Sequence, residues 1–160
     1  MKISFLLLLA IFQSASLLAR APACKADVSI LDPVFGGAYV PIGDGTTDDT
    51  QAIQNVLDYR VCTKDANGKV SCAQPCEPPV SVFFPTPQKA YLVSSLKIRA
   101  GSTLRGTGRL QPGIRGNGSG PTLIADNLVL NFTILRLSVT NTKFPAIQIT
   151  NRSSDFNLLD

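Results

Sequence analysis

The sequence predicts an all-β fold, and three observations support this class. From Val80 onward the chain consists of short apolar runs separated by Pro, Gly, Asn and Ser, which is typical of short strands joined by turns. Two of these runs, at residues 137–141 and 147–151, resemble each other. After the N-terminal leader, only residues 48–59 have a helical pattern. These features leave two architectures open, a β-sandwich and a solenoid of stacked repeats.

The composition is that of one folded domain. The chain has 160 residues, of which 44% are hydrophobic and 16% charged, with a net charge of +4. These values exclude a disordered chain. The chain contains no histidine, which excludes Ser-His-Asp and Cys-His catalysis and any histidine-bound metal within it. Glu77 is its only glutamate, so carboxylate chemistry depends on aspartate.

Residues 1–23 have the pattern of a secretory signal peptide. Lys2 precedes an apolar run over residues 3–12, and small residues follow. Three cleavage positions fit these small residues: after Ser16, after Ala19 or after Ala23. The apolar run is too short to cross a bilayer, so we expect no membrane association after the signal is removed. The predicted localisation is secreted and extracellular, with the mature domain over residues 24–160.

The cysteines agree with export. They form an even set, Cys24, Cys62, Cys72 and Cys76. Three pairings are possible, but the turn-prone residues 65–68 favour a Cys62–Cys72 disulfide, which leaves Cys24–Cys76. A zinc site is disfavoured because the chain has no Cys-x-x-Cys motif. We therefore expect two disulfides, no metal site and no cofactor.

The elements follow in order along the mature chain. Residues 24–43 are expected to be irregular, residues 43–45 form a turn, and the cysteine-bearing residues 61–79 form a loop. The expected strands are residues 80–84, 91–93, 96–98, 103–104, 122–124, 128–130, 132–134, 135–139, 146–149 and 156–158. The glycine-rich residues 113–120 are expected to be a flexible loop between strands.

The helix over residues 48–59 begins with a capping signal. Asp48 is the expected N-cap, and Gln51 three positions later completes a start that resembles a capping box. One face is apolar and consists of Ala52, Ile53, Val56 and Leu57; the opposite face consists of Gln51, Gln54, Asn55 and Asp58. The segment is therefore an amphipathic helix that covers apolar surface.

Three motifs occur in order over residues 43–108. They are Gly43-Asp44-Gly45-Thr46-Thr47-Asp48-Asp49-Thr50-Gln51-Ala52-Ile53, then Val82-Phe83-Phe84-Pro85 followed by Tyr91-Leu92-Val93-Ser94-Ser95, then Thr103-Leu104-Arg105-Gly106-Thr107-Gly108. In this order they resemble the N-terminal part of the pectate-lyase-like superfamily, in its rhamnogalacturonase/epimerase-like region. Ala90 departs from the family pattern, which has glycine there. The cysteine-bearing loop is loosely similar to an insertion in family-55 glycoside hydrolases.

The resemblance implies a right-handed parallel β-helix, with residues 24–160 as its N-terminal part and the helix as its cap. It also makes the acidic motif structural, and this motif consists of Asp44, Gly45, Asp48, Asp49 and Thr50. Physical reasoning agrees, because Asp48 would cap the helix and Asp49 would complement the helix dipole. A catalytic or calcium-binding role for these acids is the alternative.

The resemblance further implies a secreted carbohydrate-active protein. We expect it to be the N-terminal portion of a lyase or glycoside hydrolase that acts on cell-wall polysaccharide, either pectin or β-glucan. The alternative is a non-catalytic module for polysaccharide binding or surface presentation. Calcium would be needed only if the longer enzyme is a polyuronate lyase. The partner is a polysaccharide, neutral or anionic, and not a nucleic acid, because Tyr91 is the only aromatic residue between positions 85 and 125.

No catalytic residue is identified from the sequence. Glycoside hydrolysis needs two carboxyl groups flanking the bond, and the β region supplies only Asp126, Asp155 and Asp160. We therefore expect this chain alone to be inactive. The candidate substrate-facing cations are Arg105, Arg109 and Arg115, with a solvated basic face as the alternative. Three sequons, at Asn117, Asn131 and Asn151, are glycosylation acceptors in a eukaryotic source, and Asn117 is favoured because it lies in the glycine-rich segment.

Overall fold

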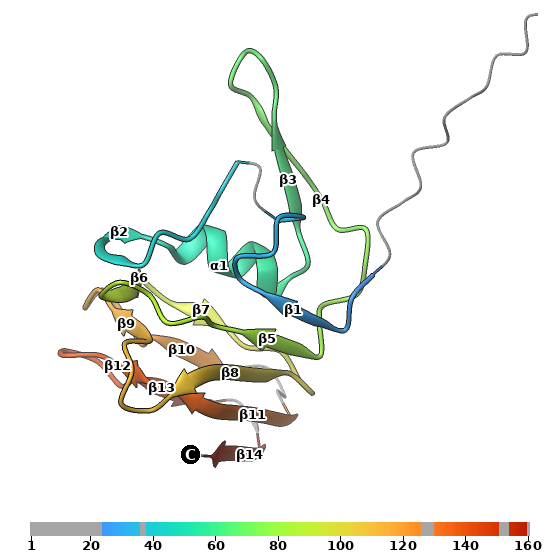
Figure 1. Ribbon diagram of the computed structural model, residues 1–160. Coiled ribbons are helices and arrows are strands. Elements are labelled where there is room, and N and C mark those ends of the chain that lie inside the picture. The colour runs from blue at the N-terminus through green and yellow to red at the C-terminus, as the bar shows by residue number, and fades with distance from the viewer. Residues whose placement is uncertain (1–23, 36–37, 126–129, 151–153, 160) are drawn as a thin grey trace, which may run out of the picture.

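The computed structural model describes residues 24–35, 38–125, 130–150 and 154–159. Most strands lie in three parallel sheets (Figure 1). The five-stranded sheet, in spatial order, contains β1 (Asp27–Ser29), β5 (Ser81–Phe83), β8 (Thr103–Gly108), β11 (Leu130–Leu137) and β14 (Ser154–Leu159). The four-stranded sheet contains β12 (Val139–Thr140), β9 (Ile114–Gly116), β6 (Ala90–Val93) and β2 (Asp44–Asp48). The three-stranded sheet contains β13 (Ile147–Ile149), β10 (Leu123–Ala125) and β7 (Leu96–Lys97).

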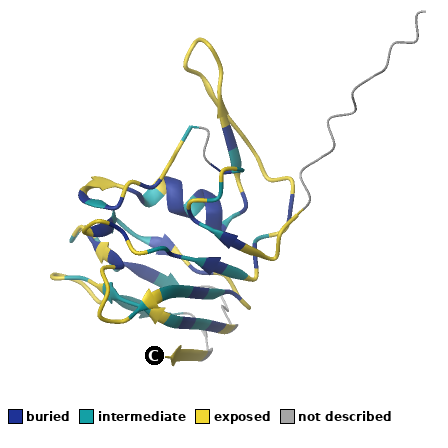
Figure 2. Ribbon diagram, viewed as in Figure 1, coloured by how far each residue is buried: buried dark blue, intermediate teal, exposed yellow. Residues whose placement is uncertain are grey.

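Alternating side chains of the five-stranded sheet form one side of the core. Val28, Val82, Leu104 and Ile134 are in register on neighbouring strands, and each is at most 4% exposed. Because side chains alternate across a strand, the residues on either side of these positions point outward. The same core contains side chains from the other two sheets, such as Val93 and Leu123. Figure 2 shows buried segments along the strands of the three parallel sheets and on the helix, whereas the projecting loop at residues 64–75 is exposed.

The helix α1 (Thr50–Leu57) lies at the β1–β2 end of the molecule, away from β14 (Figure 1). Ile53 and Val56 are fully buried, which confirms the predicted apolar face. The helix also contacts strand β7 through polar groups. The amide of Gln54 accepts a hydrogen bond from the Lys97 backbone N–H at 2.9 Å and donates one to the Lys97 carbonyl at 3.4 Å. The helix therefore pairs with the edge of β7, a position that would otherwise accept another strand.

The helix differs from the sequence prediction in its ends and in one buried residue. It is two residues shorter at each end than the expected residues 48–59. Asp49 rather than Asp48 occupies the N-cap position, and its carboxylate makes no capping hydrogen bond. Asn55, expected on the polar face, is 3% exposed, and its amide donates to Cys62 Sγ at 3.4 Å. The periodic pattern identified the helix but could not identify a tertiary partner for Asn55.

The predicted fold class, an all-β right-handed parallel β-helix, is wrong. The strands divide among several separate sheets that are mostly parallel, and one short helix contributes side chains to the core, which is an α/β-like pattern rather than a single solenoid. The physical reason is that each strand has only two to eight residues, so the chain leaves each sheet after one short pass. Several strands end at Ser or Gly, as β1, β8 and β9 do, or directly before Ser, as β6 and β11 do.

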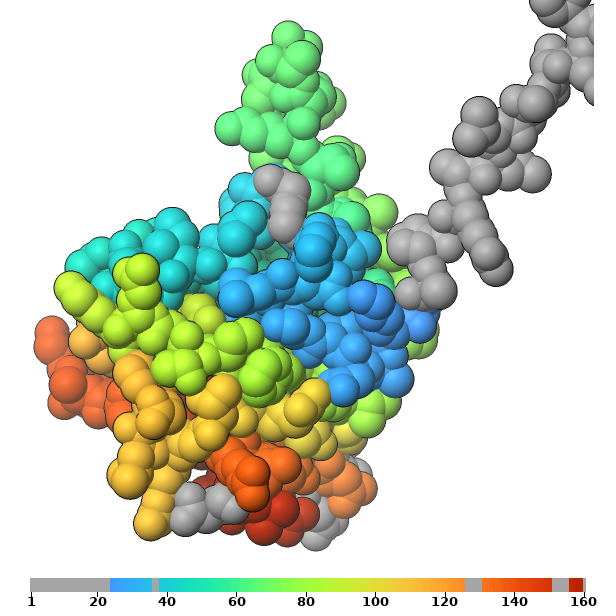
Figure 3. Space-filling model, viewed as in Figure 1, coloured from blue at the N-terminus to red at the C-terminus, as the bar shows by residue number. Residues whose placement is uncertain are grey.

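Three segments expected to be irregular contain strands. Residues 24–43 include β1, which pairs with β5, and residues 113–120 include β9, which pairs with β6 and β12. The cysteine-bearing loop contains an antiparallel hairpin of β3 (Val61–Lys64) and β4 (Val70–Ala73). Figure 3 shows this hairpin projecting from the body of the molecule. Residues 128–129 of an expected strand lie outside the described residues.

Gly113 gives a stability prediction, because a Cβ at this position would overlap the backbone carbonyl oxygen of Ser138. We expect Gly113→Ala to lower the free energy of unfolding by about 1–3 kcal/mol, as overpacking against backbone does. Urea unfolding measures this change. The matched control is Gly108→Ala, because its Cβ would lie 3.7 Å from Gln111 Cγ, an ordinary contact. Equal stability of the two variants would contradict the prediction.

Candidate binding surface

The acidic motif before the helix holds the backbone in place. Asp44 Oδ1 accepts hydrogen bonds from the backbone N–H groups of Thr46 and Thr47 at 2.8 and 2.7 Å. These bonds, chiefly the one from Thr47, hold the pKa of the Asp44 carboxyl well below its usual range. The Asp48 carboxylate accepts from the backbone N–H and the hydroxyl of Thr50. Each carboxylate therefore accepts hydrogen bonds from residues two or three positions later in the chain.

Asp49 is the buried member of the motif, with 1% of its surface exposed. Its Oδ1 accepts from the Ile42 N–H at 2.7 Å, and its Oδ2 accepts from the Gly43 N–H at 3.0 Å. Burial raises the pKa of this carboxyl, although both hydrogen bonds oppose the shift. Burial and the nearby Asp49 charge together raise the pKa of Tyr91 to about 12. These contacts support the structural interpretation of the acidic motif.

No cluster of metal-ligating side chains occurs in the described part of the chain. Among its His, Cys, Asp and Glu residues, no group of three could hold a metal ion. The acids Asp126 and Asp160 lie outside the described residues, as does the sequon residue Asn151, and the side chain of Asp155 is not described. Within the same described ranges, no helix has the length and apolar character needed to cross a bilayer.

The structure does not bring the three candidate arginines together. Arg105 lies on β8 in the five-stranded sheet, and Arg115 lies on β9 in the four-stranded sheet. Arg115 Nη2 donates to the Gly45 carbonyl at 2.5 Å, so this side chain ties β9 to the turn at the start of β2. Arg109 follows β8 and lines a cavity beside β14. The basic residues therefore do not form one cationic face.

Arg105 is the centre of an outward-facing cluster. Its Nη2 donates to both carboxylate oxygens of Asp27, at 3.0 and 2.9 Å, and its Nε donates to Ser81 Oγ at 3.2 Å. The guanidinium carbon lies 5.0 Å from the ring centroid of Phe83, which is cation–π distance. The hydrogen bonds from Ser81 and Arg105 lower the pKa of Asp27, so this carboxyl is ionised at neutral pH. The cluster combines an aromatic face with donors and acceptors.

Polar residues extend from this cluster across the outer face of the five-stranded sheet. One row in register, from β1 to β14, consists of Asp27, Ser81, Thr103, Thr133 and Asn157. The neighbouring row consists of Ser29, Phe83, Arg105, Leu135 and Leu159. Because adjacent strands are about 4.8 Å apart, a five-strand row is about 19 Å long. We call these two rows the outer sheet face.

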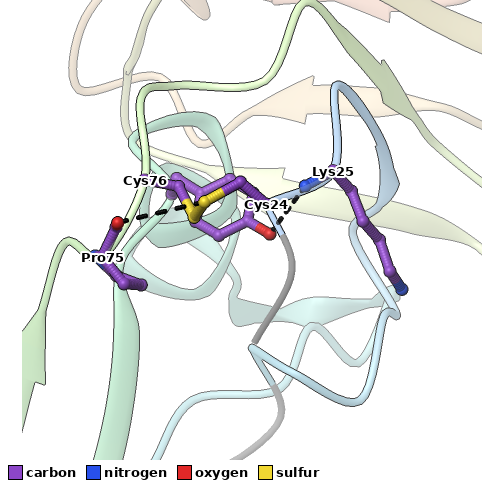
Figure 4. The surroundings of a disulfide bond; sticks show 5 residues. Cys24, Lys25, Pro75 and Cys76 are labelled. Carbon is purple, nitrogen blue, oxygen red and sulfur yellow. Dashed lines mark hydrogen bonds between the residues drawn. A yellow bond between two sulfur atoms is a disulfide. The ribbon is translucent and has the colours of Figure 1, made fainter. Parts of the chain in front are cut away.

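The Cys24–Cys76 disulfide anchors the edge of the outer sheet face (Figure 4). It joins the residue three positions before β1 to the segment that precedes β5, with the two Cα atoms 5.7 Å apart. Beside it, the Lys25 backbone N–H donates to the Tyr59 hydroxyl at 3.1 Å. The second predicted disulfide, Cys62–Cys72, is also present and links β3 to β4. Two disulfides are consistent with an oxidising, extracellular environment.

A cavity of about 280 Å³ lies beside β14, at the far end of the molecule from the helix. Apart from Arg109 its lining is apolar and consists of Ile134, Leu137, Val139, Ile147, Leu158 and Leu159. Leu159, the last residue of the outer sheet face, is the one residue that the two surfaces share. Sugar recognition needs polar groups that orient hydroxyls, and this lining offers few. The outer sheet face is therefore the better candidate for a polysaccharide site.

Sequence reasoning found Arg105 but missed its partners Asp27, Ser81 and Phe83. The alternation along β5 could have identified two of these partners, because the buried Val82 places its neighbours Ser81 and Phe83 together on the outward side of the strand. No protein-family model, curated protein or solved structure matches this chain.

Proposed function

We propose that this protein is a secreted, non-catalytic polysaccharide-binding protein that binds neutral glycan on the outer sheet face. The observation that carries the proposal is the Asp27–Arg105–Phe83 cluster, continued by a row of hydroxyl and amide side chains. An aromatic face packs against the apolar face of a sugar ring, while paired charged groups hydrogen-bond to its hydroxyls.

The charge of the cluster supports a neutral glycan rather than a polyuronate. Asp27 forms an ion pair with Arg105, and the opposite charges leave the pair with a net charge close to zero. A polyuronate carboxylate would have to approach the Asp27 carboxylate, whose side chain is 61% exposed. Hydroxyl groups, in contrast, both donate and accept, so they match a carboxylate and a guanidinium side by side. β-Glucan is therefore favoured over pectin.

The distribution of carboxylates supports binding rather than cleavage. Glycoside hydrolysis needs two carboxyl groups on opposite sides of the bond. Among residues with described side chains, Asp27 is the only acid in the two rows of the outer sheet face. We expect no release of reducing ends from β-1,3-glucan and no unsaturated product from polygalacturonate. Turnover of either substrate that is lost in Arg105→Ala would contradict the non-catalytic proposal.

We also propose that the protein is secreted. The signal pattern of residues 1–23 directs export, and the two disulfides support an oxidising destination. Both features support an extracellular destination, which is where cell-wall polysaccharide is found.

Removal of the aromatic face tests the binding proposal. We expect Phe83→Ala to weaken binding of soluble β-1,3-glucan by about tenfold, because a lost aromatic contact of about 1.4 kcal/mol corresponds to that factor. Calorimetric titration measures the affinity. The control is Arg99→Ala, which breaks a comparable Arg–Asp pair, 3.0 Å to Asp58, outside the outer sheet face. Unchanged glucan affinity in folded Phe83→Ala would contradict the proposal.

Asp27→Asn tests the preference for neutral glycan. Removing this carboxylate leaves the Arg105 charge uncompensated, so we expect the variant to gain affinity for polygalacturonate at low salt. Raising the ionic strength should abolish this gain, because exposed charges are screened. Wild-type protein that binds polygalacturonate more tightly than β-1,3-glucan would contradict the neutral-glycan proposal.

A further inference from the structure

The loop after β9 presents a sequon, Asn117-Gly118-Ser119, on the protein surface. Asn117 is exposed, and its backbone N–H donates to the Val93 carbonyl at 2.8 Å, which fixes its position beside the end of β6. Gly118 has a φ of +83°, so the chain turns immediately after the asparagine. The asparagine thus lies at the start of a tight surface turn.

The hydroxyl of this sequon contacts the asparagine that it would activate. Asn117 Oδ1 accepts a hydrogen bond from Ser119 Oγ at 2.6 Å and another from the Ser119 backbone N–H at 2.9 Å. Both contacts use the carbonyl oxygen of the amide and leave its nitrogen turned to the other side. In Asn141, by contrast, the amide nitrogen itself is engaged: Nδ2 donates to the Gly120 carbonyl and to Thr122 Oγ1, at 2.8 and 3.1 Å.

The second described sequon is placed differently. Asn131 lies within β11, between β8 and β14 in the five-stranded sheet. The next residue, Phe132, is fully buried and stacks on Phe156 with a centroid separation of 5.6 Å. Asn117 follows β9 in the four-stranded sheet, and the next residue, Gly118, lies beside the side chain of Lys143. A glycan on Asn117 would therefore leave the outer sheet face open.

We propose that Asn117 carries an N-linked glycan when the chain passes through a eukaryotic secretory pathway. The donor is a lipid-linked oligosaccharide diphosphate, and the catalyst is an oligosaccharyltransferase. The Asn117 amide nitrogen forms a bond to the anomeric carbon, and the bond from that carbon to the diphosphate oxygen breaks. The diphosphate leaves with the electron pair, and the amide proton passes to a base of the transferase. The surface position of Asn117 accommodates the product.

The test is occupancy of Asn117 itself in protein secreted from a eukaryotic host. Treatment with peptide N-glycosidase in heavy-oxygen water converts a glycosylated asparagine to labelled aspartate. Trypsin leaves Asn117 and Asn131 on one peptide, so cleavage before Asp126 is added to separate them. We expect the label at Asn117. Secreted wild-type protein with an unlabelled Asn117 would overturn the proposal.

Two substitutions at the sequon hydroxyl keep the test independent of folding. Ser119→Ala removes the sequon while Asn117 remains, and we expect it to lose the label at this position. Ser119→Thr restores a hydroxyl and should retain the label. A label at Asn117 in Ser119→Ala would contradict the proposed role of the hydroxyl at position 119 in glycosylation of Asn117. Loss of the label in secreted Ser119→Thr would contradict it as well.

Discussion

Replacing Cys24 and Cys76 together by serine is expected to lower the free energy of unfolding by about 4 kcal/mol. The disulfide joins residues separated by 52 positions, and loop closure of that length restricts the unfolded chain by about this amount. The native state also loses the anchor before β1. Urea unfolding of the secreted double variant measures the loss.

The Cys62/Cys72 double variant is the matched comparison, because it also removes one complete disulfide. Its residues are separated by only 10 positions, so the expected loss is about 3 kcal/mol. Glycan binding separates the two variants further. Loss of the Cys24–Cys76 bond frees β1, which carries Asp27, whereas loss of the other bond affects the projecting hairpin. A greater loss of stability or of binding in the Cys62/Cys72 variant would contradict this assignment.

Local patterns predicted local structure well. The expected strands beginning at Val80, Tyr91, Leu96 and Thr103 each correspond to an observed strand within one residue at the start. The turn-prone residues between Cys62 and Cys72 correctly favoured the pairing of these cysteines, and both disulfides are those expected. These features depend on neighbours in sequence, which periodicity and turn chemistry describe directly.

The arrangement of the sheets and the binding surface could not be predicted in the same way. Arg105 and Asp27 are 78 positions apart, so no local pattern places them together. β1 is only three residues long, and its sequence Asp-Val-Ser has one apolar member. It becomes a strand because β5 supplies its hydrogen bonds and the core accepts Val28. Tertiary contacts thus determine the elements that form the outer sheet face.

The acidic motif shows the same limit within a few residues. The sequence assigned the N-terminal capping role to Asp48, whereas the buried Asp49 fixes the preceding turn through Ile42 and Gly43. Adjacent acids of identical chemistry thus have different importance, because only one side chain points into the protein. Asp48 is exposed and Asp49 is buried, and the pattern of the surrounding residues does not predict which of the two is buried.

Asp49→Ala is expected to lower the free energy of unfolding by about 2–4 kcal/mol at neutral pH. The substitution leaves the buried Gly43 N–H and the partly buried Ile42 N–H without their carboxylate acceptor, and such a loss costs about 1–3 kcal/mol for a buried group and less for one that water can reach. Asp48→Ala is the control, because its carboxylate is exposed and contacts Thr50 at the helix start. Loss of that contact should cost about 1 kcal/mol.

The pH dependence gives Asp49→Ala a second readout. Burial raises the folded-state pKa of Asp49 above its ordinary value of 3.8, so between those two pKa values the folded protein binds more protons than the unfolded chain. The contribution of Asp49 to stability is therefore greatest below pH 3.8 and declines as the pH rises through the raised pKa. Urea unfolding of wild type and Asp49→Ala across this range should show the difference between them shrinking as the pH rises. A difference that grows with pH, or an Asp48→Ala variant less stable than Asp49→Ala, would contradict the structural assignment of the buried carboxylate.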